Sequence, residues 1–172
     1  MGMFMASVSF RCSDKEKWDM IKPEILNMLQ GMDGLVNNLN SDGPGYAILS
    51  PYGDKGQFLA ELPEIISMWT GDYAVMAMCV DSDFNTLELF HAGVLLEQSV
   101  IGEIYEEYSE FMEVTLPDIS HWKPLLQDPS WEDALSEAFL GEEILAEDSL
   151  RKLSKLTGLP IFDDALMMAG ME

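Results

Sequence analysis

The chain has 172 residues, of which 48% are hydrophobic, and it carries 31 Asp and Glu residues against nine Lys and Arg residues. A chain of this length buries roughly 70% of its unfolded surface, and this composition excludes an intrinsically disordered protein. The formal net charge of −22 disfavours nucleic acid and membrane surfaces as direct partners and favours a basic protein. The alternative is that the charge serves solubility alone.

No apolar run approaches the ~20 residues that span a bilayer, and the apolar start lacks the basic region of a secretion signal. We therefore expect a cytoplasmic protein. Cys12 and Cys79 lie in or beside predicted strands, and we expect free thiols. A disulfide bond between Cys12 and Cys79 remains an alternative only if these two strands are neighbours in the sheet.

The first elements follow from alternation and then from helical spacing. Residues 3–11 alternate as a strand does, and Ser13 with Glu16 forms a capping box that predicts a helix ending near Gly31. Pro23 disfavours a continuous helix, so a start near Lys22 is the alternative. Residues 32–45 are rich in Asn, Asp and Gly and predict a loop.

The central elements are a short strand, a helix and a hairpin. Residues 46–50 predict the strand, and residues 57–69 carry a helical apolar stripe. Residues 73–80 form an unbroken apolar run that predicts a buried strand, and residues 86–91 predict its hairpin partner. Residues 94–97 are either a third strand or the tail of the second.

Acidic residues dominate the chain from residue 97 to residue 148. Fifteen Asp and Glu residues stand there against one basic residue, Lys123. Apolar spacing predicts one helix over residues 102–112 and a second that begins at Ser130 as its N-cap. A third helix is predicted over residues 143–157, and a last short one over residues 163–168. The predicted buried residues are Ile104, Tyr105, Tyr108, Phe111 and Met112 in the first helix, and Trp131, Ala134, Leu135, Ala138 and Phe139 in the second.

These elements predict a single α+β domain over residues 1–172. Residues 1–99 form the sheet-containing portion, in which helices cover one face of a mainly antiparallel or mixed sheet. Residues 100–172 form a mainly helical, acidic portion.

Asp81, Asp83 and Asn85 copy the first three ligand positions of a calcium-binding loop. The pattern then fails, because Thr86 replaces the required glycine and Ala92 replaces the bidentate glutamate. Asp and Asn are also ordinary turn residues. We therefore predict no metal site, with these three residues as the one candidate.

Motifs of known catalytic chemistry are missing from the sequence. His91 and His121 are the only histidines, and no zinc, nucleophile-elbow or phosphate-loop spacing occurs. We expect a non-catalytic protein without a cofactor. The alternative is an enzyme or small-molecule-binding protein whose pocket lies between sheet and helices and uses Tyr46, Tyr73 or His91.

Two stretches support a more specific expectation. Residues 80–93, which contain VDSD and LELFHAG, and residues 139–158, which contain AEDSLRKL and LTG, resemble small bacterial α+β proteins of the immunity type in polymorphic toxin systems. The resemblance covers about a third of the chain and transfers no binding site. It implies a protein that binds and blocks a toxin.

The acidity agrees with such a role, because charge complementarity speeds encounter with a basic partner. We therefore predict that an acidic surface between residues 97 and 148 docks a basic protein, which the resemblance suggests is a toxin domain. The residues predicted to bind it are Glu103, Glu106, Glu107, Glu110, Glu142 and Glu143.

Overall fold

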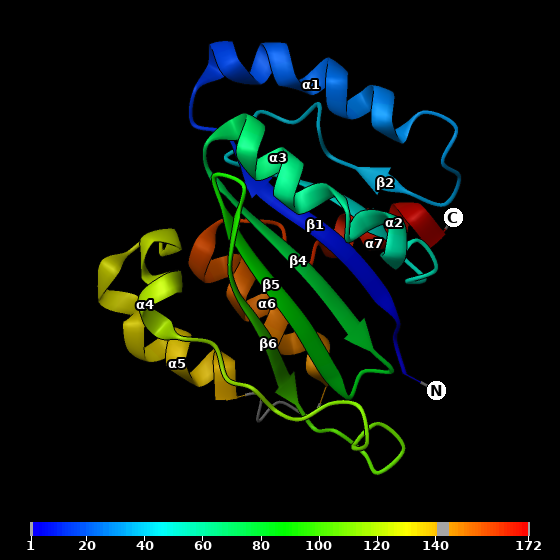
Figure 1. Ribbon diagram of the computed structural model, residues 1–172, viewed down its shortest axis with the longest axis vertical. Coiled ribbons are helices and arrows are strands. Elements are labelled where there is room, and N and C mark those ends of the chain that lie inside the picture. The colour runs from blue at the N-terminus through cyan, green and yellow to red at the C-terminus, as the bar shows by residue number, and fades with distance from the viewer. Residues whose placement is uncertain (1, 141–144, 172) are drawn as a thin grey trace.

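The computed structural model describes residues 2–140 and 145–171 and contains a six-stranded antiparallel sheet (Figure 1). The strands are β1 (Met5–Arg11), β2 (Val36–Asn37), β3 (Gly45–Ser50), β4 (Tyr73–Val80), β5 (Phe84–His91) and β6 (Val94–Gly102). Their order across the sheet is β2-β3-β1-β4-β5-β6. The predicted α+β class and antiparallel sheet are confirmed.

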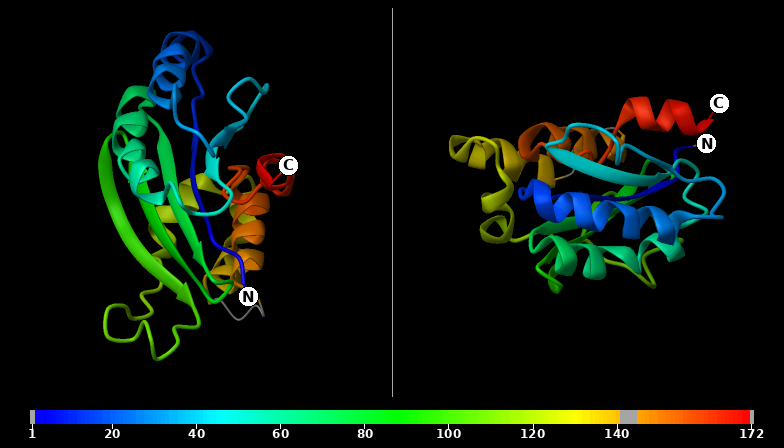
Figure 2. Two further views of the ribbon diagram at one scale, coloured as in Figure 1. Left: turned by 90° about the vertical axis from the view of Figure 1, so that its right-hand side faces the viewer. Right: turned by 90° about the horizontal axis from the view of Figure 1, so that it is seen from above.

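Helices cover both faces of this sheet. The first layer contains α1 (Lys15–Leu29), α2 (Gly56–Leu59) and α3 (Leu62–Thr70). The second contains α4 (Ile119–Trp122), α5 (Glu132–Leu140), α6 (Ala146–Thr157) and α7 (Asp164–Met171), with the 3₁₀ turns η1 (Lys123–Leu125) and η2 (Pro129–Trp131). Seen from above, α6 and α7 lie on one side of the sheet and α3 on the other (Figure 2). The layer formed by α1, α2 and α3 agrees with the prediction that helices of the N-terminal portion cover one face of the sheet. The layer formed by α4 to α7 places the C-terminal portion on the opposite face.

Strand β1 shows why both faces are buried. Val8 and Phe10 pack against α1 and α3 on one face of the sheet, whereas Met5 packs against the C-terminal helices on the opposite face. All three residues are 0% exposed. Ser7 lies on the Met5 side, where its hydroxyl donates a hydrogen bond of 2.7 Å to the carbonyl of Ile161. Because alternate side chains of a strand point to opposite faces, a strand without solvated positions requires a layer on each side.

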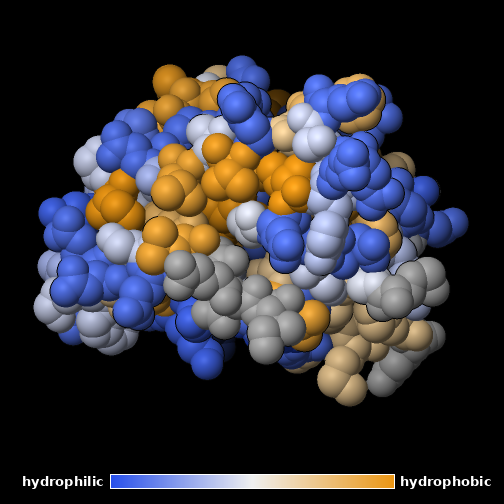
Figure 3. All heavy atoms as spheres, turned by 90° about the horizontal axis from the view of Figure 1, so that it is seen from below, coloured by the Kyte–Doolittle hydropathy of each residue, from blue (hydrophilic) through white to orange (hydrophobic). Residues whose placement is uncertain are grey.

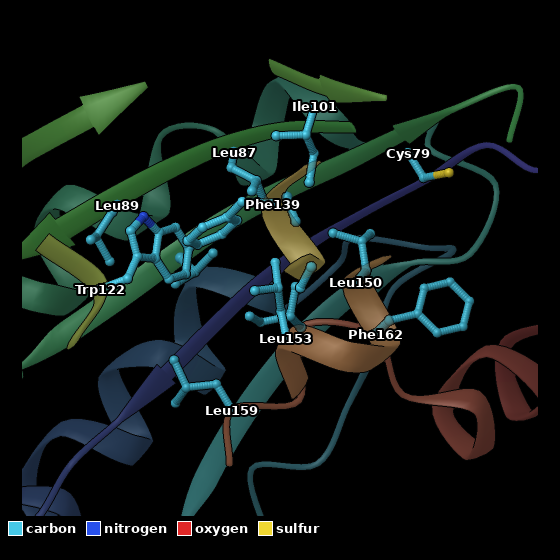
Figure 4. Close-up of a cluster of buried hydrophobic side chains, with 14 of the residues drawn as sticks. Cys79, Leu87, Leu89, Ile101, Trp122, Phe139, Leu150, Leu153, Leu159 and Phe162 are labelled. Carbon is cyan, nitrogen blue, oxygen red and sulfur yellow. The ribbon is translucent and has the colours of Figure 1, made fainter. Parts of the chain in front are cut away.

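The core between the sheet and the C-terminal helices is formed by large side chains (Figure 4). Trp122 is 0% exposed, and its ring lies edge-on to Phe139 at 5.2 Å. Leu150 from α6 and Leu87 from β5 belong to the same buried cluster. Full burial of such a side chain contributes about 1.5–3 kcal/mol.

Helix α1 runs from Lys15 through Pro23, so the alternative start near Lys22 is wrong. Trp18, in the first turns, is only 6% exposed, and its packing holds these turns against the sheet. The N-cap is Asp14 rather than Ser13, because its side chain accepts a 3.2 Å hydrogen bond from the amide of Lys17.

Two further predictions are corrected in the N-terminal portion, and one alternative left open by the sequence is decided. The stripe over residues 57–69 forms two helices, α2 and α3, and Pro63 stands in the first turn of α3, where a missing N–H costs nothing. The predicted loop over residues 32–45 includes β2, which pairs with β3. Residues 94–97 begin a third strand that extends to Gly102.

The C-terminal helices also depart from the prediction. Trp131 is 39% exposed and Ala134 is exposed, so neither joins the buried face of α5. Asp128, not Ser130, caps the turn that precedes it. Gly158 ends α6 in the left-handed conformation, at φ 76°, as predicted.

Both cysteines are free, as predicted. Strands β1 and β4 are neighbours, but Cys79 pairs with Met5 at one end of β1, and Cys12 follows its other end. In the described part of the chain, no helix is both long and apolar enough to cross a membrane.

Candidate functional site

Residues 103–116, here called the acidic segment, follow β6 and return along it. The amide of Glu103 donates to the carbonyl of Asp83 at 2.9 Å. Val100 and Thr115 exchange two backbone hydrogen bonds of 2.9 Å. Gly102 lies between these anchors at φ 113°, and an added Cβ would lie 2.6 Å from the Asp83 carbonyl oxygen. Only glycine fits this close approach.

Successive turns, rather than the predicted helix, form the acidic segment between its anchors. A helix would place Glu103 beside Glu107 and Glu106 beside Glu110, and like charges four residues apart destabilise a helix. The turns are held instead by Tyr108, whose carbonyl accepts from the amide of Phe111 at 3.0 Å. The Tyr108 ring also packs edge-on against Phe84, at 5.2 Å between centroids.

Apolar side chains of the acidic segment are exposed beside its carboxylates. Phe111 is 81% exposed and Tyr105 is 46% exposed, so the prediction that they face the core is wrong. Viewed from the end of the molecule that carries this segment, hydrophobic side chains lie among hydrophilic ones (Figure 3). The exposed glutamates of the segment are Glu103, Glu106, Glu107, Glu110 and Glu113.

Carboxylates lie close enough at this surface to repel one another. Burial, and then the charges of Asp81, Glu103 and Glu107, raise the pKa of Asp83 above its ordinary value. The charges of Glu103 and Asp83 are the largest causes that raise the pKa of Tyr105. No Lys or Arg occurs between Lys55 and Lys123 to offset this field. A cation that approached the segment would relieve the repulsion.

A groove of about 520 Å³ separates the acidic segment from β5 and β6. Glu88 and Gln98 lie on its floor, and Phe111 and Glu113 belong to its wall. The amide of Gln98 donates to a carboxylate oxygen of Glu88 at 2.9 Å. The groove therefore presents two carboxylates beside an aromatic ring, an arrangement that suits a basic side chain with an apolar stem.

Glu97 differs from the exposed glutamates, because its carboxylate makes hydrogen bonds within the protein. It accepts hydrogen bonds from the indole of Trp122 and from the amide of Asp118, the latter at 2.9 Å. His121 Nδ1 lies 3.2 Å from the same carboxylate. Glu97 thus fastens α4 to β6 and is not part of the exposed surface.

Glu147 is also structural. It is 4% exposed in the first turn of α6 and accepts a 3.1 Å hydrogen bond from the hydroxyl of Ser82. Burial, followed by the charge of Glu147, raises the pKa of Cys79 to about 12. Such a thiol stays protonated at neutral pH and is a poor nucleophile.

Four of the six glutamates predicted to bind a partner lie together. Glu103, Glu106, Glu107 and Glu110 are all exposed on the acidic segment. Glu142 and Glu143 lie outside the described residues. Whether the four contact a partner stays a prediction.

The candidate metal residues have separate roles in the structure. Asp81 accepts from the amide of Gly2 at 2.8 Å, whereas Asn85 is fully buried and its Nδ2 donates to the carbonyl of Ala146 at 2.8 Å. Asp81 and Ser82 have positive φ angles of 52° and 59°, as in a tight hairpin turn. Among the described residues, no group of three or more His, Cys, Asp or Glu side chains is placed to hold a metal ion.

The three residues named for a pocket between sheet and helices do not form one site. Tyr73 and His91 contact each other across β4 and β5, with ring centroids 4.3 Å apart. Tyr73 packs against the core beneath the C-terminal helices, whereas Tyr46 belongs to the core on the opposite face.

No protein-family model, curated protein or solved structure matches this chain. The exposed aromatics were missed because helical spacing counted Tyr105 and Phe111 as core residues. The like-charged glutamates four residues apart were the signal against that helix.

Proposed function

We propose that this protein is a non-catalytic binding protein that docks a basic protein partner on the acidic segment. The observation that carries the proposal is the 81% exposure of Phe111 among five exposed glutamates. The resemblance to immunity proteins adds a toxin domain as the proposed partner. The proposed location is the cytoplasm, where free thiols such as Cys12 and Cys79 persist.

The two kinds of side chain have different roles in this proposal. The glutamates attract and orient a positively charged surface over long range, which raises the association rate. Phe111 and Tyr105 supply apolar area that becomes buried on contact, and aromatic residues commonly dominate binding energy in interfaces. The groove beside Phe111 offers Glu88 and Glu113 to a Lys or Arg side chain of the partner.

Affinity capture from the native cell, with bound proteins identified by mass spectrometry, tests the proposal. The bait is compared with two double variants, Glu106→Lys/Glu110→Lys and Asp133→Lys/Glu137→Lys. All four positions are exposed and both variants change the net charge equally, but the second pair lies on α5. We expect a basic protein, retained at about 0.15 M salt, that the first variant loses and the second keeps.

Phe111→Ala should weaken binding of that protein by about tenfold or more, because the ring is the proposed anchor. Met20→Ala is the matched control, since Met20 on α1 is 77% exposed. Equal loss of all captured proteins with both charge variants, or their removal by moderate salt, would show that the charge serves solubility alone. Binding that is unchanged in Phe111→Ala would refute the anchor.

A further inference from the structure

A second surface feature lies away from the acidic segment, beside α1, and these two regions are at opposite ends of the molecule (Figure 1). It is a cleft of about 370 Å³ between the first turns of α1 and the chain that leads into β3. The residues that decide its chemistry are Lys15, Asp19 and Lys22 from the helix, and Ser41, Asp42 and Tyr46 from the opposite wall. Its volume is within the range of small-molecule sites.

Tyr46 is the residue that points to a ligand. The side chain is packed between aromatic neighbours, with its ring stacked on Trp18 at 4.0 Å and 5.7 Å from Phe10, and the residue is only 7% exposed. Its hydroxyl has no hydrogen-bond partner among residues 2–140 and 145–171. Although most of the residue is buried, the oxygen itself is not among the fully buried side-chain atoms that lack a partner, so it is open at the surface to a ligand or to water.

The surroundings of the phenol place the hydroxyl at the cleft. Burial raises its pKa first, followed by the charges of Cys12, Asp42 and Asp19. All three of these residues line the cleft. The polar end of Tyr46 therefore faces the cavity, while its ring belongs to the core.

Charges of both signs line the cleft without pairing. Lys15 and Lys22 stand two helical turns apart on one face of α1, about 10 Å along the axis, and Asp19 lies between them. Asp42 faces them from the loop. The ion pairs in the described part of the chain involve none of these four side chains. Two ammonium groups and two carboxylates are thus available to a ligand.

We propose that this cleft binds a small zwitterion of the amino-acid or dipeptide class. Lys15 and Lys22 would hold its carboxylate, Asp19 and Asp42 its ammonium group, and the Tyr46 hydroxyl would complete the hydrogen bonding. This site goes beyond partner binding and does not depend on it.

Other ligand classes fit the cleft less well. A phosphate would meet two carboxylates, and an apolar ligand would leave four charges desolvated. A neutral sugar usually stacks on an open aromatic face, but Trp18 and Tyr46 are stacked on each other. The balance of charges is what selects a zwitterion.

The test is a titration of the isotope-labelled full chain, followed by amide and indole NMR signals. The probes are the twenty free amino acids and glycylglycine, and the blocked controls are the N-acetylated amides of any probe that binds. We expect a saturable shift of the Trp18 indole N–H for at least one zwitterion and none for its blocked form. No saturable shift up to about 10 mM, a limit that corresponds to very weak binding, would overturn the proposal.

Variants then identify the site. Tyr46→Phe keeps the ring and removes only the hydroxyl, so binding should weaken by about threefold to tenfold. Tyr52→Phe is the control, because Tyr52 is 61% exposed and outside the cleft. Lys22→Gln should weaken binding of the same probe, and Lys55→Gln should not. Unchanged affinity in both Tyr46→Phe and Lys22→Gln, or equal binding of the blocked probe, would reject the site.

Discussion

Two neighbouring stretches are rich in glutamate and aspartate, yet they differ in structure. The acidic segment has no helix, whereas residues 132–140 and 146–157 form α5 and α6. Four of the five acids in these two helices stand in a first turn, Glu132 and Asp133 in α5 and Glu147 and Asp148 in α6, where they favour the helix dipole; Glu137 is the exception. In the acidic segment they recur every four residues and repel one another.

Apolar partners make the second difference. Phe139 of α5 is 3% exposed against Trp122, whereas Phe111 of the acidic segment is 81% exposed. Acidic composition alone therefore does not decide whether a stretch of chain is helical or exposed as a binding surface. What decides this is the position of each charged residue relative to the helix ends and to the buried side chains.

The largest expected effect separates the two kinds of aromatic residue. Trp122→Ala should lower the free energy of unfolding by about 3–5 kcal/mol, because a fully buried indole leaves a cavity. Phe111→Ala should change it by less than about 0.5 kcal/mol, because the ring is exposed. Urea denaturation followed by circular dichroism measures both. Similar losses would mean that Phe111 is a core residue after all.

The next effect separates the two kinds of glutamate. Glu147→Ala should cost about 1–3 kcal/mol of unfolding free energy, because it leaves the Ser82 hydroxyl without its buried acceptor at the start of α6. Glu106→Ala should be neutral or slightly stabilising, because it removes a like charge. Thermal and chemical unfolding of both variants provide the measurement. A neutral Glu147→Ala variant would contradict a structural role.

The smallest effect is a pair of opposite pH responses. For Asp72, burial acts to raise the pKa, but hydrogen bonds from Arg11 and from the amide of Tyr73 outweigh it, so the net pKa is lowered. A carboxylate with a lowered folded-state pKa adds stability above its unfolded value of about 3.9, and that stability is lost as pH falls through the folded pKa. Asp72→Asn should therefore destabilise at pH 7, by about 1 kcal/mol, and much less in acid.

Asp83 should respond in the other direction. Its folded-state pKa is raised by burial and by Asp81, Glu103 and Glu107, so its charge costs stability at pH 7. That cost disappears as pH falls through the raised pKa and is absent below about 3.9. Asp83→Asn should stabilise at pH 7 by less than about 0.5 kcal/mol, and less still at high salt. Stability curves between pH 3 and pH 8 that move together for both variants would contradict this reading.

Much of the fold was predictable because its strands and helix ends carry local signals. The apolar run of β4, the hairpin turn at Asp81 and the left-handed Gly158 each depend on residues close in the sequence. Predictions failed where a distant contact decided the outcome. Trp18 holds α1 together on the N-terminal side of Pro23, and pairing with β3 makes a strand of two residues in the predicted loop.

The candidate sites show the same division. The four glutamates of the acidic segment were predicted from charge density, but the exposure of Phe111 was not, because helical spacing does not reveal whether a partner exists for an apolar face. Tyr46 was named among three pocket residues, yet its cleft depends on how a loop approaches α1. Cys79 and Glu147 are 68 residues apart, and only folding brings them together.

By itself, the sequence determined the α+β class, the antiparallel hairpin at the centre and the large negative charge, since periodicity, turn chemistry and ionisable groups are properties of short stretches. The tertiary structure alone decided that helices cover both faces of the sheet, which acids are buried, and where unpaired polar and apolar side chains are exposed. Those outcomes depend on contacts between residues far apart in the chain, because burial and electrostatic repulsion are set by the neighbours that folding supplies.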